Sequence, residues 1–190
     1  GQGVTNPYTR HASVTASATA TIHELSGGRA FLGIGAGFTA MTTMSMKARP
    51  MAEFRSVIEF FKGYTAGREV EYRGAKMHSE WSRNQVPVYI ASLGPRSLQM
   101  AGELGDGVIL IGIRPEIMKW NIEQVGKRAE MAGREVSTLD LWARTMIYIA
   151  SSKEEARTNL AASAAMMACD AWRSLLRRDT PEVADLRNRM

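Results

Sequence analysis

The turn Ser92-Leu93-Gly94-Pro95 carries residue types that bind phosphate groups. It follows a predicted strand and opens a predicted helix, whose first backbone amides have no partners within the helix and attract anions together with the helix dipole. Gly94 allows a close approach of the backbone to an anion, and Pro95 suits the first helical position. Ser92 and Ser97 add hydroxyl groups. The alternative interpretation is an ordinary strand-to-helix turn.

A second candidate for phosphate binding is Gly112-Ile113, which follows the next predicted strand. Adjacent strand ends with glycine form the usual phosphate position of α/β barrel enzymes. Either Arg96 or Arg114 could pair with the phosphate. The two turns together predict a phosphate site, and a mild positive field, from a net charge of +5, suits a phosphorylated cofactor.

The glycines of Gly33-Ile34-Gly35-Ala36-Gly37 do not predict a dinucleotide site. The spacing is G-x-G-x-G followed by Phe38, so the last glycine of G-x-G-x-x-G is missing. No helix starts at once, and no acidic residue closes a second strand about 20 positions later. We expect these glycines, which lack side chains, to leave space for a flat ring inside the mouth of a barrel.

Other kinds of catalytic site find little support. The three histidines do not share metal-ligand spacing with carboxylates, and no G-x-S-x-G motif accompanies them. We expect His11 to cap the first helix, and His23 and His78 to be structural or exposed. The single cysteine, Cys169, excludes an internal disulfide, and its helical surroundings of Ala and Met predict a buried, inert thiol. We predict no metal site.

Short apolar strands alternate with helices along the chain, which predicts a parallel α/β sheet. The predicted strands are 30–35, 86–91, 107–111 and 139–150, after a first strand that ends near residue 5; the predicted helices are 13–25, 51–64, 95–104, 115–132 and 152–178; a loop at 38–48 and a surface hairpin near 69–78 complete the chain. These elements alone leave a barrel and an open sheet as alternatives. Asp106 is expected to fix a turn at the end of the sheet opposite the site.

Length and composition fit one domain over residues 1–190. The lysines and arginines are scattered, which argues against a nucleic-acid partner, and no apolar run is long enough for a membrane span. We expect a cytoplasmic protein. About five strands are predicted, whereas an eight-unit barrel takes about 250 residues, so we expect an incomplete barrel domain. Apolar surface left exposed would favour a homodimer.

The runs at residues 1–11 and 25–37 resemble the luciferase-like monooxygenase superfamily, particularly its deazaflavin-dependent methylenetetrahydromethanopterin reductase-like branch. The resemblance continues in register to about residue 150 and implies a TIM (β/α)8 barrel of the luciferase-like type. In that family, the match to Gly3-Val4-Thr5-Asn6 is a strand-end bulge with a non-prolyl cis peptide, which backs one face of the isoalloxazine or deazaflavin ring. We place that peptide bond at Gly3-Val4. One departure is His11-Ala12, where the family usually has His-Pro.

The resemblance also implies that the Ser92–Pro95 turn and Gly112-Ile113 bind the cofactor phosphate. The expected function is hydride transfer between coenzyme F-420 and a small organic substrate. The alternatives are an FMN-dependent monooxygenase, a non-catalytic accessory subunit or fragment of such a protein, and a flavin-free barrel enzyme that binds sugar phosphates. The family's first two strands often supply polar residues near the reactive carbon, and they lie outside this chain, so no catalytic acid or base is assigned.

Overall fold

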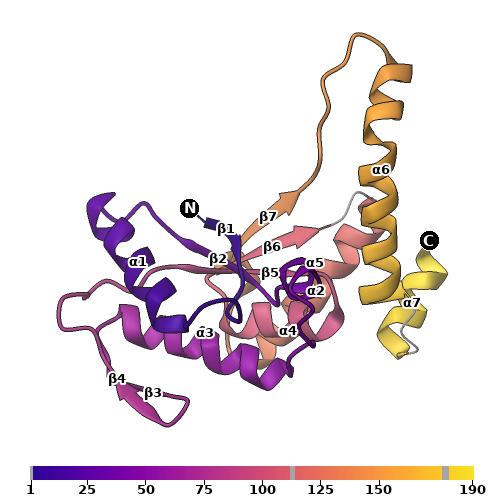
Figure 1. The fold of residues 1–190 in the computed structure, drawn as a ribbon. Helices are drawn as coiled ribbons and strands as arrows, with labels where there is room; N and C mark the ends of the chain where they lie inside the picture. Colours follow the sequence, from indigo (N-terminus) through magenta and orange to yellow (C-terminus); the bar gives the residue numbers. More distant parts are fainter. Residues whose placement is uncertain (1, 112–113, 177–179) are drawn as a thin grey trace.

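A five-stranded parallel sheet organises the chain in the order β1-β2-β5-β6-β7 (Figure 1). The computed structural model describes residues 2–111, 114–176 and 180–190. The strands of this sheet are β1 (Gln2–Thr5), β2 (Leu32–Gly35), β5 (Val88–Ser92), β6 (Gly107–Ile111) and β7 (Asp140–Arg144). The helices are α1 (Ala12–Leu25), α2 (Phe38–Thr43), α3 (Met51–Thr65), α4 (Pro95–Leu104), α5 (Pro115–Met131), α6 (Lys153–Ala171) and α7 (Pro181–Arg189). A π-helical turn, Trp172–Leu176, follows α6.

One face of the sheet forms the hydrophobic core with the helices. Alternate residues of the central strands, such as Ile34, Ile90 and Leu110, point to this face and are at most 1% exposed. Buried side chains of α1, α3, α4 and α5 belong to the same cluster. The apolar stripe of α3 contributes to it, since Phe54 and Phe61 are both buried. Strands that are buried by crossover helices read as continuous apolar runs, which is why the sequence shows them clearly.

The opposite face of the sheet is less covered. Tyr89 and Ala91 on β5 are only half-buried, and Trp142 on β7 is 41% exposed. Parallel pairing puts Ala91 beside Ile109 in register, and Ile109 beside Trp142, so these side chains share one face. We call this surface the open face. Parallel sheets are normally covered on both faces, which makes the open face the natural place for a ligand or for further chain.

Asp106 holds the end of the sheet at which β5 and β6 begin, as the sequence predicts. Its Oδ2 accepts a hydrogen bond from the Val88 amide at 2.9 Å, and its Oδ1 accepts from Lys62 Nζ at 2.8 Å. Lys62 also donates to the Leu104 carbonyl at 2.9 Å. These bonds tie α3 to the strand starts of β5 and β6. They lie at the end opposite the Ser92 turn and take no part in the candidate site.

Several element predictions are confirmed closely. The helix 95–104 and the strand 107–111 are found with the predicted bounds. The surface hairpin consists of β3 (Val70–Tyr72) and β4 (Ala75–Met77), which pair antiparallel. His11 caps α1, with its Nδ1 accepting from the Ser13 amide at 3.3 Å. His23 is buried and its Nδ1 lies 2.7 Å from the Ala30 carbonyl, a structural role.

Other predictions are wrong, and the reasons are physical. The expected loop 38–48 contains helix α2, whose Met41 amide donates to the Gly37 carbonyl at 2.8 Å. The expected strand 139–150 pairs only over β7, because its neighbour β6 ends at Ile111. The expected helix 152–178 is α-helical only over Lys153–Ala171 and continues as the π-helical turn to Leu176, while residues 177 and 178 lie outside the described residues. Cys169 is exposed, because α6 has no buried residue.

Within the described ranges, none of the helices has the length and apolar composition needed to cross a membrane.

Candidate functional site

The open face carries a cavity of about 450 Å³, which we call the open-face cavity. Its lining comes from β1, β5, β6 and β7 together with Phe31 before β2. The lining residues are Gly3, Val4, Phe31, Ala91, Ile109, Ile111, Trp142, Ala143 and Arg144. Arg144 is the one charged side chain among them. The cavity therefore suits a flat, largely apolar group with one polar or anionic edge.

Gly3 and Val4, predicted as site residues, both line this cavity. The peptide bond between them is cis, as the family resemblance implies. A Cβ added to Gly3 would meet nothing within 4 Å, so the strand borders open space there. The structure thus brings the first strand and the ends of β6 and β7 to one cavity, although they are far apart in sequence.

Thr5 and Asn6, the other two residues of the predicted bulge, have different environments. Thr5 pairs in register with Ile34 on β2. Asn6 Oδ1 accepts hydrogen bonds from the amides of Tyr8 at 3.0 Å and Thr9 at 3.1 Å, which closes a turn at the end of β1. A Cβ on Gly37, whose φ is +73°, would lie 2.6 Å from Asn6 Cβ. Asn6 therefore shapes the strand exit, and it is not among the residues that line the cavity.

The predicted phosphate turn lies between β5 and α4. Gly94 is the N-cap residue of α4 and makes no side-chain capping bond, while Pro95 occupies the first turn. The Ser92 hydroxyl donates to the Ser97 carbonyl at 3.0 Å, and the Ser97 hydroxyl donates to the Gly94 carbonyl at 2.9 Å. Both hydroxyl protons thus hold the turn itself together. The anion-binding capacity of the turn rests on the early backbone amides of α4, not on these hydroxyls.

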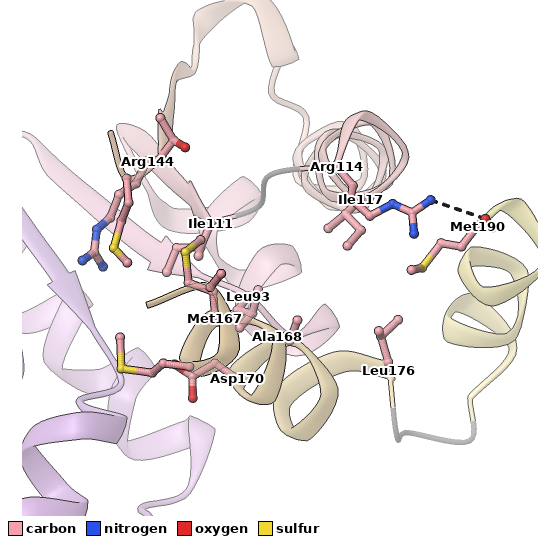
Figure 2. A pocket seen from close by; sticks show the side chains of 15 residues that line it. Leu93, Ile111, Arg114, Ile117, Arg144, Met167, Ala168, Asp170, Leu176 and Met190 are labelled. Atoms are coloured by element: carbon pink, nitrogen blue, oxygen red, sulfur yellow. Dashed lines mark hydrogen bonds between the residues drawn. The ribbon is translucent and has the colours of Figure 1, made fainter. Parts of the chain in front are cut away.

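A second cavity, of about 270 Å³, adjoins the first; we call it the methionine cavity. It lies between α6 and the strand ends, and it shares Ile111 and Arg144 with the open-face cavity (Figure 2). Leu93 of the predicted phosphate turn also lines it. Four methionines contribute to its wall: Met146, Met166, Met167 and Met190. Gly112 and Ile113, the remaining predicted site residues, lie outside the described residues.

The two predicted arginines, Arg96 and Arg114, differ from the cavity-lining Arg144 in their partners. Arg114 Nε donates to Glu116 Oε2 at 3.3 Å, and its Nη2 donates to the Met190 carbonyl at 3.4 Å (Figure 2). Arg96 is exposed at the start of α4. Arg144 has no ion pair or hydrogen bond of its side chain within the part of the chain that the structure describes. Arg144 is therefore the best-placed cation to receive an anionic group in the cavities.

An aromatic cluster, which we call the aromatic floor, contributes Phe31 and Trp142 to the lining of the open-face cavity. The rings of Phe31, Tyr89 and Trp142 lie with centroids 4.7 to 5.0 Å apart. Tyr89 Oη and Trp142 Nε1 donate to Asp140 Oδ2 at 2.7 Å and 2.8 Å. Burial, followed by the hydrogen bond to Asp140, raises the pKa of Tyr89 to about 12. The phenol stays protonated at neutral pH, so this cluster is a rigid support and not a general base.

The described residues contain no group of three His, Cys, Asp or Glu side chains placed to hold a metal ion. Nor does a carboxylate, histidine or cysteine line the open-face cavity among those residues. The site therefore supports binding and orientation. Sequence reasoning missed Trp142 and Arg144, although their alternation with Asp140 along one predicted strand would have put all three on one face.

Comparisons with known proteins point to one family. A family model described as "Luciferase-like monooxygenase" matches residues 1–188. The 5,10-methylenetetrahydromethanopterin reductase of Methanolobus tindarius is 35% identical over 167 residues, which cover 83% of this chain and 51% of that protein. The chain thus spans about half the length of this curated relative.

Two solved structures resemble the fold. The coenzyme F-420 dependent tetrahydromethanopterin reductase from Methanopyrus kandleri matches with a TM-score of 0.67 and 29% identity, over 81% of this chain and 51% of the other. An F-420-dependent secondary alcohol dehydrogenase, in complex with an F-420–acetone adduct, matches with a TM-score of 0.75 over 98% of this chain and 60% of the other. Its identity is 18%, so it supports the fold alone. The five-stranded sheet is accordingly part of a barrel fold of the luciferase-like type.

Proposed function

The chain belongs to the luciferase-like monooxygenase family, and from that premise we propose that its protein transfers a hydride between coenzyme F-420 and a small organic substrate. The deazaflavin, when bound, supplies the carbon that gives or takes the hydride. The coenzyme F-420 dependent reductase from Methanopyrus kandleri, at 29% identity, supports F-420 over FMN. Because the chain spans about half of that protein, the activity is proposed for the whole protein.

The observation that carries this proposal is the open-face cavity and its neighbouring phosphate turn. The cavity, of about 450 Å³, has apolar walls on which a flat ring can lie, from Gly3 and Val4 on one strand and Ala91 and Ile109 on others. Gly3 leaves open space where any other residue would place a Cβ. These residues fit a deazaflavin ring, and they are the ones that would hold it.

The N-terminus of α4 would hold the cofactor phosphate. Gly94 offers no side chain to cap the helix, so the amides of the first turn remain available to an anion. Pro95 presets the helical conformation there without using a donor. Gly112 and Ile113 remain predicted contributors to the same phosphate site. An FMN phosphate would fit the same turn, so the preference for F-420 rests on the relatives.

The residues that line the open-face cavity would orient the ring against the substrate and exclude water from between them. Hydride transfer depends on holding a ring against a substrate more than on a strong acid or base. Hydrogen bonds from Tyr89 and Trp142 to Asp140 hold Trp142 in place in the lining of the cavity. Arg144 supplies the single positive charge at its edge. We also propose a cytoplasmic location and a homodimer, as the sequence leads us to expect.

The test is a pair of equilibrium titrations of the purified, folded chain, with F-420 and separately with FMN, followed by cofactor fluorescence. We expect saturable binding of F-420 that is tighter than binding of FMN. Binding of FMN alone would favour the monooxygenase alternative. If a folded chain of the expected mass binds neither cofactor, a non-catalytic accessory subunit or fragment becomes the better interpretation, and hydride transfer by this chain is overturned.

A further inference from the structure

We propose that the methionine cavity binds the apolar body of a monoanionic, amphipathic small molecule whose anionic group pairs with Arg144. The inference rests on the proposed function only in taking this molecule to be the substrate. The walls of the cavity and the charges around it support the site independently of that, and ligand binding there can be measured without a cofactor.

The walls of the cavity select an apolar occupant. Most of its lining is hydrophobic, including Leu93 of the turn after β5, Ile111 of β6, Ile117 of α5 and Met167 of α6. Apolar cavities of about 150 Å³ already stay dry and take up benzene-sized groups, and this one is about 270 Å³. Methionine side chains are flexible and polarisable, so a wall with four of them can adapt to aliphatic or aromatic groups.

Arg144 gives the cavity one cationic corner. It stands at the last paired position of β7, opposite Ile111, and these two residues line both cavities. No acidic side chain neutralises it among the described residues, whereas Arg114 is already bonded to Glu116 and to the Met190 carbonyl. An anion paired with Arg144 would sit at the junction, with the apolar body on the α6 side. That position puts the molecule next to the open-face cavity.

Asp170 limits the occupant to a single anionic group. It comes from α6 and lines the methionine cavity, whereas Arg144 enters from β7 (Figure 2). A carboxylate in this wall repels a second negative charge on the occupant. A monocarboxylate should therefore bind better than a dicarboxylate of the same length.

The experiment uses three eight-carbon probes: octanoate, 1-octanol and octanedioate. Each is titrated into the full chain carrying labelled methionine methyl groups, and binding is followed by the NMR shift of the Met167 methyl, with that of Met77 on the distant β4 strand as internal reference. For about ten heavy atoms we expect a Kd of about 1 mM or tighter for octanoate. Octanedioate should bind about tenfold more weakly.

Variants separate the two parts of the proposal. Arg144→Gln should weaken octanoate about tenfold and leave 1-octanol unchanged. Arg157→Gln, which removes an exposed arginine of α6 outside the cavity wall, is the matched control and should change neither. Asp170→Asn removes the repelling carboxylate, so it should reduce the difference in Kd between octanoate and octanedioate. Thermal melts verify that each variant is folded.

Three results would overturn the inference: a Met167 methyl that does not respond to octanoate, equal effects of the Arg144 and Arg157 variants, or octanoate binding no tighter than 1-octanol. The outcome of the cofactor titrations does not depend on the outcome of these octanoate experiments. A chain that ignores F-420 but binds octanoate through Arg144 would refute the proposed function and retain this site.

Discussion

Arg55 and Glu103 form a bidentate ion pair that links α3 to α4. The Nη1–Oε1 distance is 2.9 Å and the Nη2–Oε2 distance is 2.7 Å. Arg128 of α5 donates to the same carboxylate at 2.9 Å. The Glu103 side chain is only 20% exposed, so water screens this cluster less than it would an ordinary surface pair. The hydrogen bond from Arg55, followed by that from Arg128, lowers the pKa of Glu103 to about 2.

This shift predicts a stability that depends on pH. Because folding lowers the pKa of Glu103, the cluster stabilises the fold fully above the unfolded-state pKa of about 4.3 and loses its contribution as pH falls towards about 2. We expect Glu103→Gln to lower the free energy of unfolding by about 1–2 kcal/mol at pH 7, and by less at pH 3.5. Urea denaturation measures both values. Glu59→Gln, at a more exposed carboxylate, is the control. If Glu103→Gln lowered the free energy of unfolding by the same amount at pH 7 and pH 3.5, the lowered pKa of Glu103 would be refuted.

Gly102 sets the distance between α4 and α5. A Cβ on it would collide with the Val125 carbonyl oxygen and lie 3.2 Å from the Ala129 amide nitrogen. Both neighbours are backbone in a helix and cannot move aside, so Gly102→Ala should cost about 1–3 kcal/mol of stability. Gly126→Ala, on the facing helix, is the matched control, because its new methyl would meet only Val136 Cγ2, at 3.3 Å. Equal melting temperatures for the two variants would contradict this packing.

Helix α6 frames the methionine cavity and begins with a side-chain cap. Ser152 Oγ accepts from the Glu155 amide at 3.1 Å, and Glu155 Oε2 accepts from the Ser151 amide at 3.1 Å. Ser152→Ala should destabilise the start of α6 by about 1 kcal/mol. Hydrogen exchange should then speed up in α6 while the amides of β5 and β6 stay protected. Unchanged exchange in α6 would show that the cap contributes nothing measurable.

The segment between β7 and α6 exposes a run of apolar side chains. Ile147 and Ile149 are 81% and 93% exposed, and such surface favours association. We predict a homodimer through this segment, which the double variant Ile147→Lys, Ile149→Lys converts to a monomer. Sedimentation velocity measures the change, with Ile22→Lys, at an exposed position of α1, as control. A wild-type chain that is monomeric at every concentration would refute the prediction.

The sequence predicts best where a local pattern decides the structure. The strand 107–111 and the helix 95–104 are found because an apolar run and a Pro start are local signals. The extent of β7 is not local, since it depends on where β6 ends at Ile111. The exposure of Cys169 likewise depends on how far α6 stands from the body of the protein, which no periodicity of the helix reveals.

In the candidate site, too, the sequence predicts the features that depend on local pattern but not those that depend on tertiary structure. The Gly94-Pro95 start of α4 and the position of Gly3 and Val4 follow from the sequence and its family resemblance. That the two serine hydroxyls of the turn face their own backbone is a matter of side-chain geometry. Arg144 escapes prediction because the alternation along β7 says which residues share a face, but not which face is left without helices.

The most direct test of the proposed cofactor site fills the open-face cavity. Ala91 lines it at the centre of the sheet, whereas Ala162 is exposed on α6 and lines neither cavity. Fluorescence titration with F-420 should show at least about tenfold weaker binding to Ala91→Trp than to the wild-type chain, and wild-type affinity for Ala162→Trp. Wild-type affinity for a folded Ala91→Trp chain would contradict a deazaflavin ring in this cavity.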